Sequence, residues 1–195
     1  SVLITINIFI INVRIKSTMQ FTPLNTASGR AVVWRWVSPA VSSSSNCISA
    51  WAATSAVTYG GVIGQPSHPR CLRYTFTAMW NGGNVTVNGT FDGQAISYVI
   101  PSAPGSTNVD IPTALFTTVT SITKSVVGTT GSVSIGYGDY LGVENNNINL
   151  EQFGVGVVNG AVVTLNNTSR ADGRSALFGL SPNGARTFIL SVNKA

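Results

Sequence analysis

The strongest constraint on this chain is its choice of residues for building secondary structure. Val, Ile and Thr contribute 23, 15 and 21 of the 195 residues, whereas Glu, Lys and Gln contribute only 2, 3 and 4. The first group favours strands, and the second is the usual material of exposed helix faces. This bias excludes a helical bundle and argues against a doubly wound α/β fold. With 20 Gly, 22 Ser, 17 Asn and 8 Pro available for turns, we expect many short strands.

Alternation and turn residues place the expected strands. Residues 71–80 alternate cleanly and predict a half-buried strand whose inner face carries Leu72, Tyr74, Phe76, Ala78 and Trp80. Strands are expected at 85–91 and 94–100 on either side of Asp92-Gly93, and within 155–165 on either side of Asn159-Gly160. Each of these dipeptides predicts a two-residue hairpin, because type I′ turns need positive φ at both central positions. Further strands are expected at 30–37, 54–63, 115–123 and 132–136, and 175–180 is expected to pair with 186–192. The pattern predicts an all-β fold, either a β-sandwich or a jelly-roll or Ig-like small barrel.

The chain is expected to have three parts: residues 1–18, 19–70 and 71–195. Residues 1–16 are rich in Ile and Val but too short and too interrupted for a membrane span, and their positive charges come last, unlike a signal peptide. We interpret residues 1–18 as a strand or arm that pairs with a neighbouring subunit. Residues 19–70 are expected to form an N-terminal β segment with a loop at 38–46, and 71–195 a β-sandwich module. Translation starting at Met19 is an open alternative.

Charged residues make up 9% of the chain, against roughly 25% in typical soluble domains. Residues 1–91 contain no acid, and all six acids lie between Asp92 and Asp172. This asymmetry could steer docking against a charged partner or a neighbouring copy, or it could reflect scattered solvated charges. Direct binding of nucleic acid is not expected, because no dense basic cluster interleaves with aromatic residues. Cys47 and Cys71 are expected to be buried thiols, with a disulfide as the alternative.

The inventory for catalysis and metal binding is small. His68 is the only histidine, and with Cys71 and Cys47 it falls one ligand short of a closed zinc site. Asp139, Glu144 and Asn145–Asn147 bring oxygen atoms together, yet their spacing matches no calcium loop. The glycines of 136–142 and 154–160 match no nucleotide-binding motif and are interpreted as turn and bulge glycines. We therefore predict no catalytic, cofactor or metal site.

One region resembles a known family. Residues 73–143 contain RYTFTAMWNGGNVTVNGTFDGQAISYVI, then TTVTSIT, then GTTGSVSIGYGDYLGV. These segments resemble a β-module common in virion proteins of tailed phages, and the segment from Ala161 through Asp172-Gly173-Arg174 to Phe188 is similar to one that often closes such proteins. The resemblance covers residues 71–192. It implies a non-enzymatic structural protein located in the virion, in the first place a capsid decoration or cement protein.

The expected partners are the major capsid protein, other virion proteins and further copies of this chain. Association with a membrane is not expected. A tail or fibre component is the nearest alternative. An extracellular carbohydrate-binding adhesin would expose aromatic rings, for which Trp51, Tyr137 and Tyr140 are the candidates. A hydrolase would need His68 or a pair of acids in a pocket.

Overall fold

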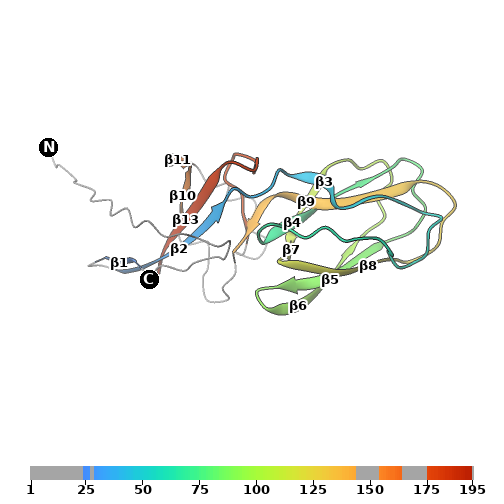
Figure 1. Ribbon diagram of the computed structural model, residues 1–195, viewed down its shortest axis with the longest axis horizontal. Helices are drawn as coiled ribbons and strands as arrows, with labels where there is room; N and C mark the ends of the chain where they lie inside the picture. The colour runs from blue at the N-terminus through green and yellow to red at the C-terminus, as the bar shows by residue number, and fades with distance from the viewer. Residues whose placement is uncertain (1–23, 27–28, 144–153, 164–174, 195) are drawn as a thin grey trace.

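The computed structural model describes residues 24–26, 29–143, 154–163 and 175–194, which form strands joined by turns and loops. The fold is all-β, which confirms the prediction from composition. A terminal sheet has the order β1-β2-β13-β10-β11, and the other strands form a sandwich of two further sheets (Figure 1). Residues 1–18, for which an N-terminal strand or arm is expected, lie outside the described residues. Within the described residues, no helix is long and apolar enough to cross a membrane.

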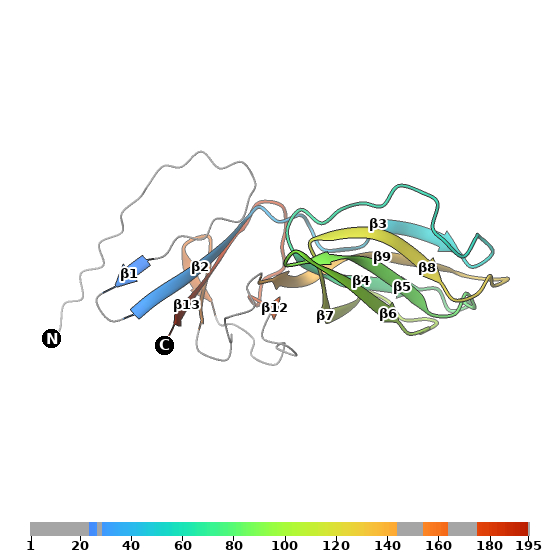
Figure 2. The same ribbon diagram turned by 90° about the horizontal axis from the view of Figure 1, so that it is seen from below.

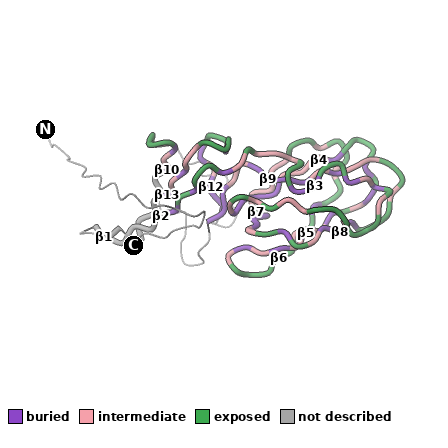
Figure 3. The backbone as a smooth tube through the Cα atoms, viewed as in Figure 1, coloured by how far each residue is buried: buried purple, intermediate pink, exposed green. Residues whose placement is uncertain are grey.

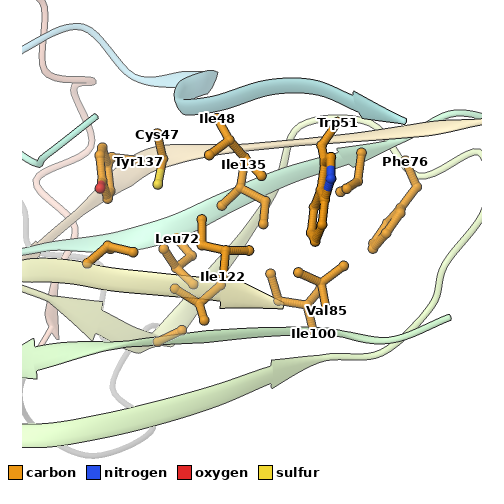
Figure 4. Close-up of a cluster of buried hydrophobic side chains, with 14 of the residues drawn as sticks. Cys47, Ile48, Trp51, Leu72, Phe76, Val85, Ile100, Ile122, Ile135 and Tyr137 are labelled. Carbon is orange, nitrogen blue, oxygen red and sulfur yellow. The ribbon is translucent and has the colours of Figure 1, made fainter. Parts of the chain in front are cut away.

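The sandwich packs one sheet over another. The first sheet has the order β12-β9-β4-β7, with β3 also paired to β9, and the second has the order β6-β5-β8. The bounds are β3 Ser43–Ala52, β4 Arg70–Phe76, β5 Val85–Phe91, β6 Gln94–Ile100, β7 Val109–Phe116, β8 Thr118–Lys124, β9 Ser132–Gly142 and β12 Ser175–Ala176. In Figure 4, inward side chains of both sheets, such as Ile135 and Ile122, face each other in one apolar core. Burial of this core from water is the main stabilising contribution.

The terminal sheet joins the two ends of the described chain. Its bounds are β1 Leu24–Thr26, β2 Gly29–Val37, β10 Gly154–Val158, β11 Ala161–Val163 and β13 Thr187–Lys194. β2 pairs antiparallel with β13 from Val37↔Thr187 to Arg30↔Lys194. The expected parts 19–70 and 71–195 therefore interleave, since β2 belongs to the terminal sheet and β3 to the sandwich. Figure 2 shows the terminal sheet and the sandwich side by side along the long axis.

A second core binds the terminal sheet to the end of the sandwich. Trp34 and Trp36 of β2 are fully buried, whereas Arg35 between them is exposed. This is the alternation that the sequence of residues 30–37 predicts. They pack in one cluster with Phe178, Phe188 and Leu141. Leu141 belongs to β9, so one strand contributes to both cores. Figure 3 shows buried backbone running from the sandwich into this junction.

Both predicted hairpins are confirmed. Val85↔Ile100 through Phe91↔Gln94 pair without interruption around Asp92 and Gly93, whose φ angles are 53° and 71°. Asn159 and Gly160, with φ angles of 50° and 85°, connect β10 to β11 in the same way. These turns are specified locally, by two residues that tolerate positive φ.

Several expected strands differ from those observed. Residues 54–63 form turns and a single bridge, Thr58↔Thr123, and the predicted loop at 38–46 gives way to β3 at Ser43. The strand predicted for 71–80 ends at Phe76, so Ala78 is exposed, while Trp80 reaches the core from the following turn. The strand predicted for 115–123 is divided between β7 and β8, which lie in different sheets.

The last expected pair is also wrong. Ser175 and Ala176 pair with Gly142 and Leu141 of β9, whereas β13 pairs with β2 and β10. These contacts join strands that are distant in sequence, so local turn residues do not specify them.

The glycines of 136–142, interpreted from the sequence as turn and bulge glycines, lie inside β9 and not in a turn. Gly138 lies where the register of β9 with β4 shifts, as expected of a bulge glycine. A Cβ on Gly136 would lie 2.0 Å from the Ser43 carbonyl oxygen, and one on Gly138 would lie 2.2 Å from Asp110 Oδ1. Real Cβ atoms do not approach other atoms so closely, so the backbone of Ser43 requires glycine at 136, whereas a side chain at 138 would have to displace the Asp110 carboxylate.

Candidate functional site

Among the described strands, β12, β3, β7, β8 and β6 lie at edges of the two sheets of the sandwich. β12 is only two residues long, and β3, β7 and β8 are protected against pairing with another chain. The outer edge of β8 is covered by the loop before β4. Tyr59 N donates to Ile122 O at 2.9 Å, and Lys124 N donates to Val57 O at 2.9 Å. The Gln65 side chain completes the cover, because its amide both accepts from Val119 N and donates to Val119 O at 2.9 Å.

The edges of β3 and β7 are protected by irregularity. The pairing of β3 with β9 shifts register twice, and Gly64 N donates to Cys47 O on the outer side of β3 at 2.8 Å. β7 contains Pro112, which removes a backbone donor, and its register with β4 shifts between Cys71 and Leu72. Bulges, proline and covering loops are the usual means by which proteins keep sheet edges from associating.

The edge of β6 has none of these protections. Its seven residues, QAISYVI, include no charge and no proline, and all seven pair with β5 in unbroken register. Among the described residues, no hydrogen bond joins its outer edge to another segment. Ile96 and Tyr98 face the core but are only half-buried, and Val99 is 50% exposed on the opposite face. In Figure 1, β6 is the outermost strand of its sheet. We call residues 94–100 the open edge.

A second exposed surface lies at the end of the sandwich farthest from the terminal sheet. Met79, Val126 and Val127 are 68%, 48% and 57% exposed on the two turns there. Asn81 holds these turns together, since its Oδ1 accepts from Thr129 N at 2.9 Å and from Thr130 N at 3.0 Å. We call Met79, Val126 and Val127 the apolar tip; the hydrogen bonds of Asn81 hold in place the two turns that carry it.

A charged network crosses the first sheet near the terminal sheet. Arg73 of β4 donates from Nη2 to Asp110 Oδ2 at 3.0 Å and to Asp139 Oδ2 at 2.9 Å, and its Nε also contacts Asp110. These bonds, above all those to Asp110, raise the pKa of Arg73 above its usual value. The predicted charge asymmetry is therefore partly cancelled inside the fold, where a basic strand meets two acids.

Arg70 links this network to the segment that enters the sandwich. Its guanidinium is buried and donates from Nε to Gly138 O at 2.9 Å, from Nη2 to Ser42 Oγ at 2.7 Å, and from Nη1 to Ala40 O. Ser42 Oγ in turn donates to Asp139. Burial lowers the pKa of Arg70. The network fixes residues 40–42, which connect β2 to β3, and its position indicates a structural role.

The residues considered for metal binding or catalysis are not brought together. Cys47 and Cys71 are free and buried in different clusters, so the alternative of a disulfide is wrong. Burial raises the pKa of Cys47 to about 11 and that of Cys71 to about 12, which keeps both as neutral thiols. His68 lies in a loop next to Ser67 Oγ, at 3.2 Å. Asp139 is held by Arg73, and residues 144–147 lie outside the described residues.

No group of three or more His, Cys, Asp or Glu side chains suited to a metal ion occurs within the part of the chain that the structure describes. Two of the three rings proposed for stacking on sugars are buried, and the third is partly accessible. Trp51 is 5% exposed and Tyr137 is 1% exposed, and Tyr140 is half-buried. Trp51 packs edge-on against Tyr59, and Tyr137 donates its hydroxyl to Gly64 O at 2.7 Å.

The open edge was not singled out from the sequence, although residues 94–100 were correctly predicted as a strand. Its signal is the lack of charge, proline and interruption in seven consecutive residues. That signal indicates an open edge only when the order of strands places β6 at the edge of its sheet.

In comparisons with known proteins, no family model, no curated protein and no solved structure matches this chain.

Proposed function

We propose that this chain is a structural protein of a virus particle, in the first place a decoration or cement protein that stabilises the shell. The observation that carries the proposal is the open edge, a regular and uncharged strand on a sandwich whose edges at β3, β7 and β8 are protected and whose remaining edge strand, β12, has only two residues. A strand in this condition is suited to β-augmentation, in which the main chain of a neighbour extends the sheet. Its partners would be the major capsid protein, other virion proteins or further copies of the chain.

Two further observations support the proposal. The segments that resemble phage virion modules, residues 73–143, supply β4 through β9 and so most of the sandwich. The apolar tip adds a second contact surface, because Met79, Val126 and Val127 stand on turns without a charged residue. A molecule with contact surfaces along one edge and at one end can bridge neighbouring subunits.

Quantitative mass spectrometry of gradient-purified particles from the source culture tests the proposal. Hundreds of copies per particle are expected for a decoration protein of the shell. A few copies would instead assign the chain to a tail or fibre. Absence from the particles would refute a role in the virion.

The N-terminal residues provide a second test. Left unpaired, an apolar strand would promote aggregation, so we expect residues 1–18 to pair within the assembly. Deleting them is expected to abolish incorporation into particles while leaving the far-UV circular dichroism spectrum of the purified chain unchanged in shape. Undiminished incorporation of the shortened chain would contradict this role.

A further inference from the structure

The backbone of the open edge presents a symmetric set of hydrogen-bonding groups. The two-residue turn at Asp92-Gly93 makes Phe91 and Gln94 a hydrogen-bonded pair, and the pairs then alternate along the hairpin. The N–H and C=O groups of Gln94, Ile96, Tyr98 and Ile100 thus point to β5. Those of Ala95, Ser97 and Val99 point outward, which gives three donors and three acceptors centred on Ser97.

We propose that two copies of this chain pair through β6, antiparallel, about a two-fold axis at Ser97. In this register Ser97 lies opposite Ser97, and Ala95 lies opposite Val99 on both sides of the axis. All six outward groups then form hydrogen bonds, and two three-stranded sheets become one of six strands. An isologous contact of this kind closes on itself.

The side chains of the open edge fit a second copy. On the core side, Ile96 of one copy lies opposite Tyr98 of the other, an aromatic and β-branched pair of the kind that stabilises cross-strand contacts. Both are half-buried in the single chain, so pairing would cover their remaining exposed surface. On the outer side only Ala95, Ser97 and Val99 meet. Since the strand has no charge, like charges do not oppose self-pairing as they would on an edge with Lys or Glu.

The expected strength matches an assembly better than a free dimer. A strand of seven residues is about 23 Å long, and pairing along it alone buries less than the roughly 1,200 Å² typical of stable interfaces. The dimer would therefore be weakly populated in dilute solution, and most chains would pair only at the high local concentration of a particle surface. The inference deepens the proposed function. It rests on that function only in one respect, the high local concentration that a particle surface would provide.

Disulfide trapping tests the contact even when it is weak. Paired residues on hydrogen-bonded sites have Cα atoms about 5.5 Å apart, within the range that a disulfide spans. Ser97→Cys in the full chain, oxidised with copper-phenanthroline, is expected to form a covalent dimer at least ten times faster than Val62→Cys. Val62 is the matched control, because it is 91% exposed and lies in a loop away from β6. The native Cys47 and Cys71 are buried, so the unsubstituted chain serves as the blank.

Two further variants test the register. A mixture of Ala95→Cys and Val99→Cys chains, one of them carrying a size tag, is expected to yield mixed dimers faster than either variant yields its own dimer. A Ser97→Cys rate no higher than that of Val62→Cys would overturn self-pairing, and fastest dimerisation of Ala95→Cys alone would overturn the proposed axis. These experiments use the purified chain, so their failure is distinct from absence of the protein from particles.

Discussion

At the scale of single residues, Lys124 has the least ordinary environment. Its side chain is 2% exposed, and its ammonium donates to Ala52 O at 2.8 Å and also to Ala53 O. The same group lies 4.8 Å from the ring centroid of Trp51 and 5.9 Å from that of Trp80. Desolvation lowers the pKa of Lys124, while two carbonyl dipoles and two indole faces favour the charge. The lysine thus ties β8 to the turn after β3.

We expect Lys124→Met to destabilise the chain. The substituted side chain keeps similar bulk but removes the charged donor from both carbonyl oxygens, which retain only their backbone donors, Ser55 N to Ala52 O and Gly128 N to Ala53 O. Loss of these charge-assisted hydrogen bonds is expected to cost about 1–3 kcal/mol in total. Urea denaturation followed by circular dichroism measures the change in the free energy of unfolding. The exposed Val127→Thr is the control, with an expected change within about 0.5 kcal/mol. A Met variant as stable as the native chain would mean that desolvation of the ammonium cancels its hydrogen bonds.

His68 makes stability depend on pH. Burial, and then the positive charge of Arg70, lower the pKa of His68 from its usual 6.5. The unfolded chain therefore binds a proton at a higher pH than the folded chain does. It follows that the stabilising effect of the neutral ring is present above pH 6.5 and declines as the pH falls below that value.

The comparison with His68→Gln checks this sign. The free energy of unfolding of the native chain, minus that of the variant, is expected to be constant above pH 7 and to decrease as the pH is lowered through 6.5. A difference that grows on acidification would show instead that the folded state binds the proton more tightly.

At the scale of elements, Gly89 shows why one strand has its sequence. β5 bulges against β8 between Asn88 and Gly89, and a Cβ at Gly89 would lie 2.0 Å from the Thr118 carbonyl oxygen. Gly89→Ala is expected to lower the free energy of unfolding by about 1–3 kcal/mol, as overpacking in a core does. Gly60→Ala is the matched control, because a Cβ there meets nothing within 4 Å. Equal effects of the two substitutions on the urea midpoint would contradict this account.

The elements that the sequence predicts correctly are those determined by neighbouring residues. Asp92-Gly93 and Asn159-Gly160 specify hairpins because both residues of each pair adopt positive φ. Alternation around Arg35 likewise predicts the buried face of β2. By contrast, residues 54–63 contain enough apolar residues for a strand but instead form a loop that covers the edge of β8 through Tyr59.

The candidate site could be predicted only in part. Residues 94–100 have the alternation of a strand, but whether that strand lies inside a sheet or at its edge depends on partners distant in sequence. The same dependence explains why Ser175 and Ala176 pair with β9 and not with β13. The buried thiols were predicted, while the contacts of Arg70 with residues 40–42 carry no local signal.

At the scale of the whole molecule, the two cores are expected to unfold together. β9 runs through the sandwich and then supplies Leu141, which is fully buried against Trp34 and Trp36 of the terminal sheet. Arg70 holds the connection between β2 and β3 at the same junction. Separation of the two parts would expose Leu141 and leave the bonds of Arg70 broken, so partial unfolding is costly.

The four tryptophans allow this cooperativity to be measured. Trp34 and Trp36 report on the terminal core, and Trp51 and Trp80 on the sandwich core, and each is at most 5% exposed. The double variant Trp51→Phe/Trp80→Phe leaves fluorescence only from the terminal core, and Trp34→Phe/Trp36→Phe only from the sandwich. In each variant the urea midpoint from fluorescence is expected to equal that from circular dichroism, which reports on all strands.

Leu141→Ala sharpens the measurement, because it removes the side chain that the two parts share. The substitution is expected to cost about 2–5 kcal/mol, as for other buried leucines, and to lower both midpoints together. If the terminal-core signal alone moves to lower urea, the junction does not couple the two cores, and the terminal sheet is an independently unfolding unit. Coincident shifts would instead establish that the two cores unfold as one cooperative unit, coupled at Leu141 of β9.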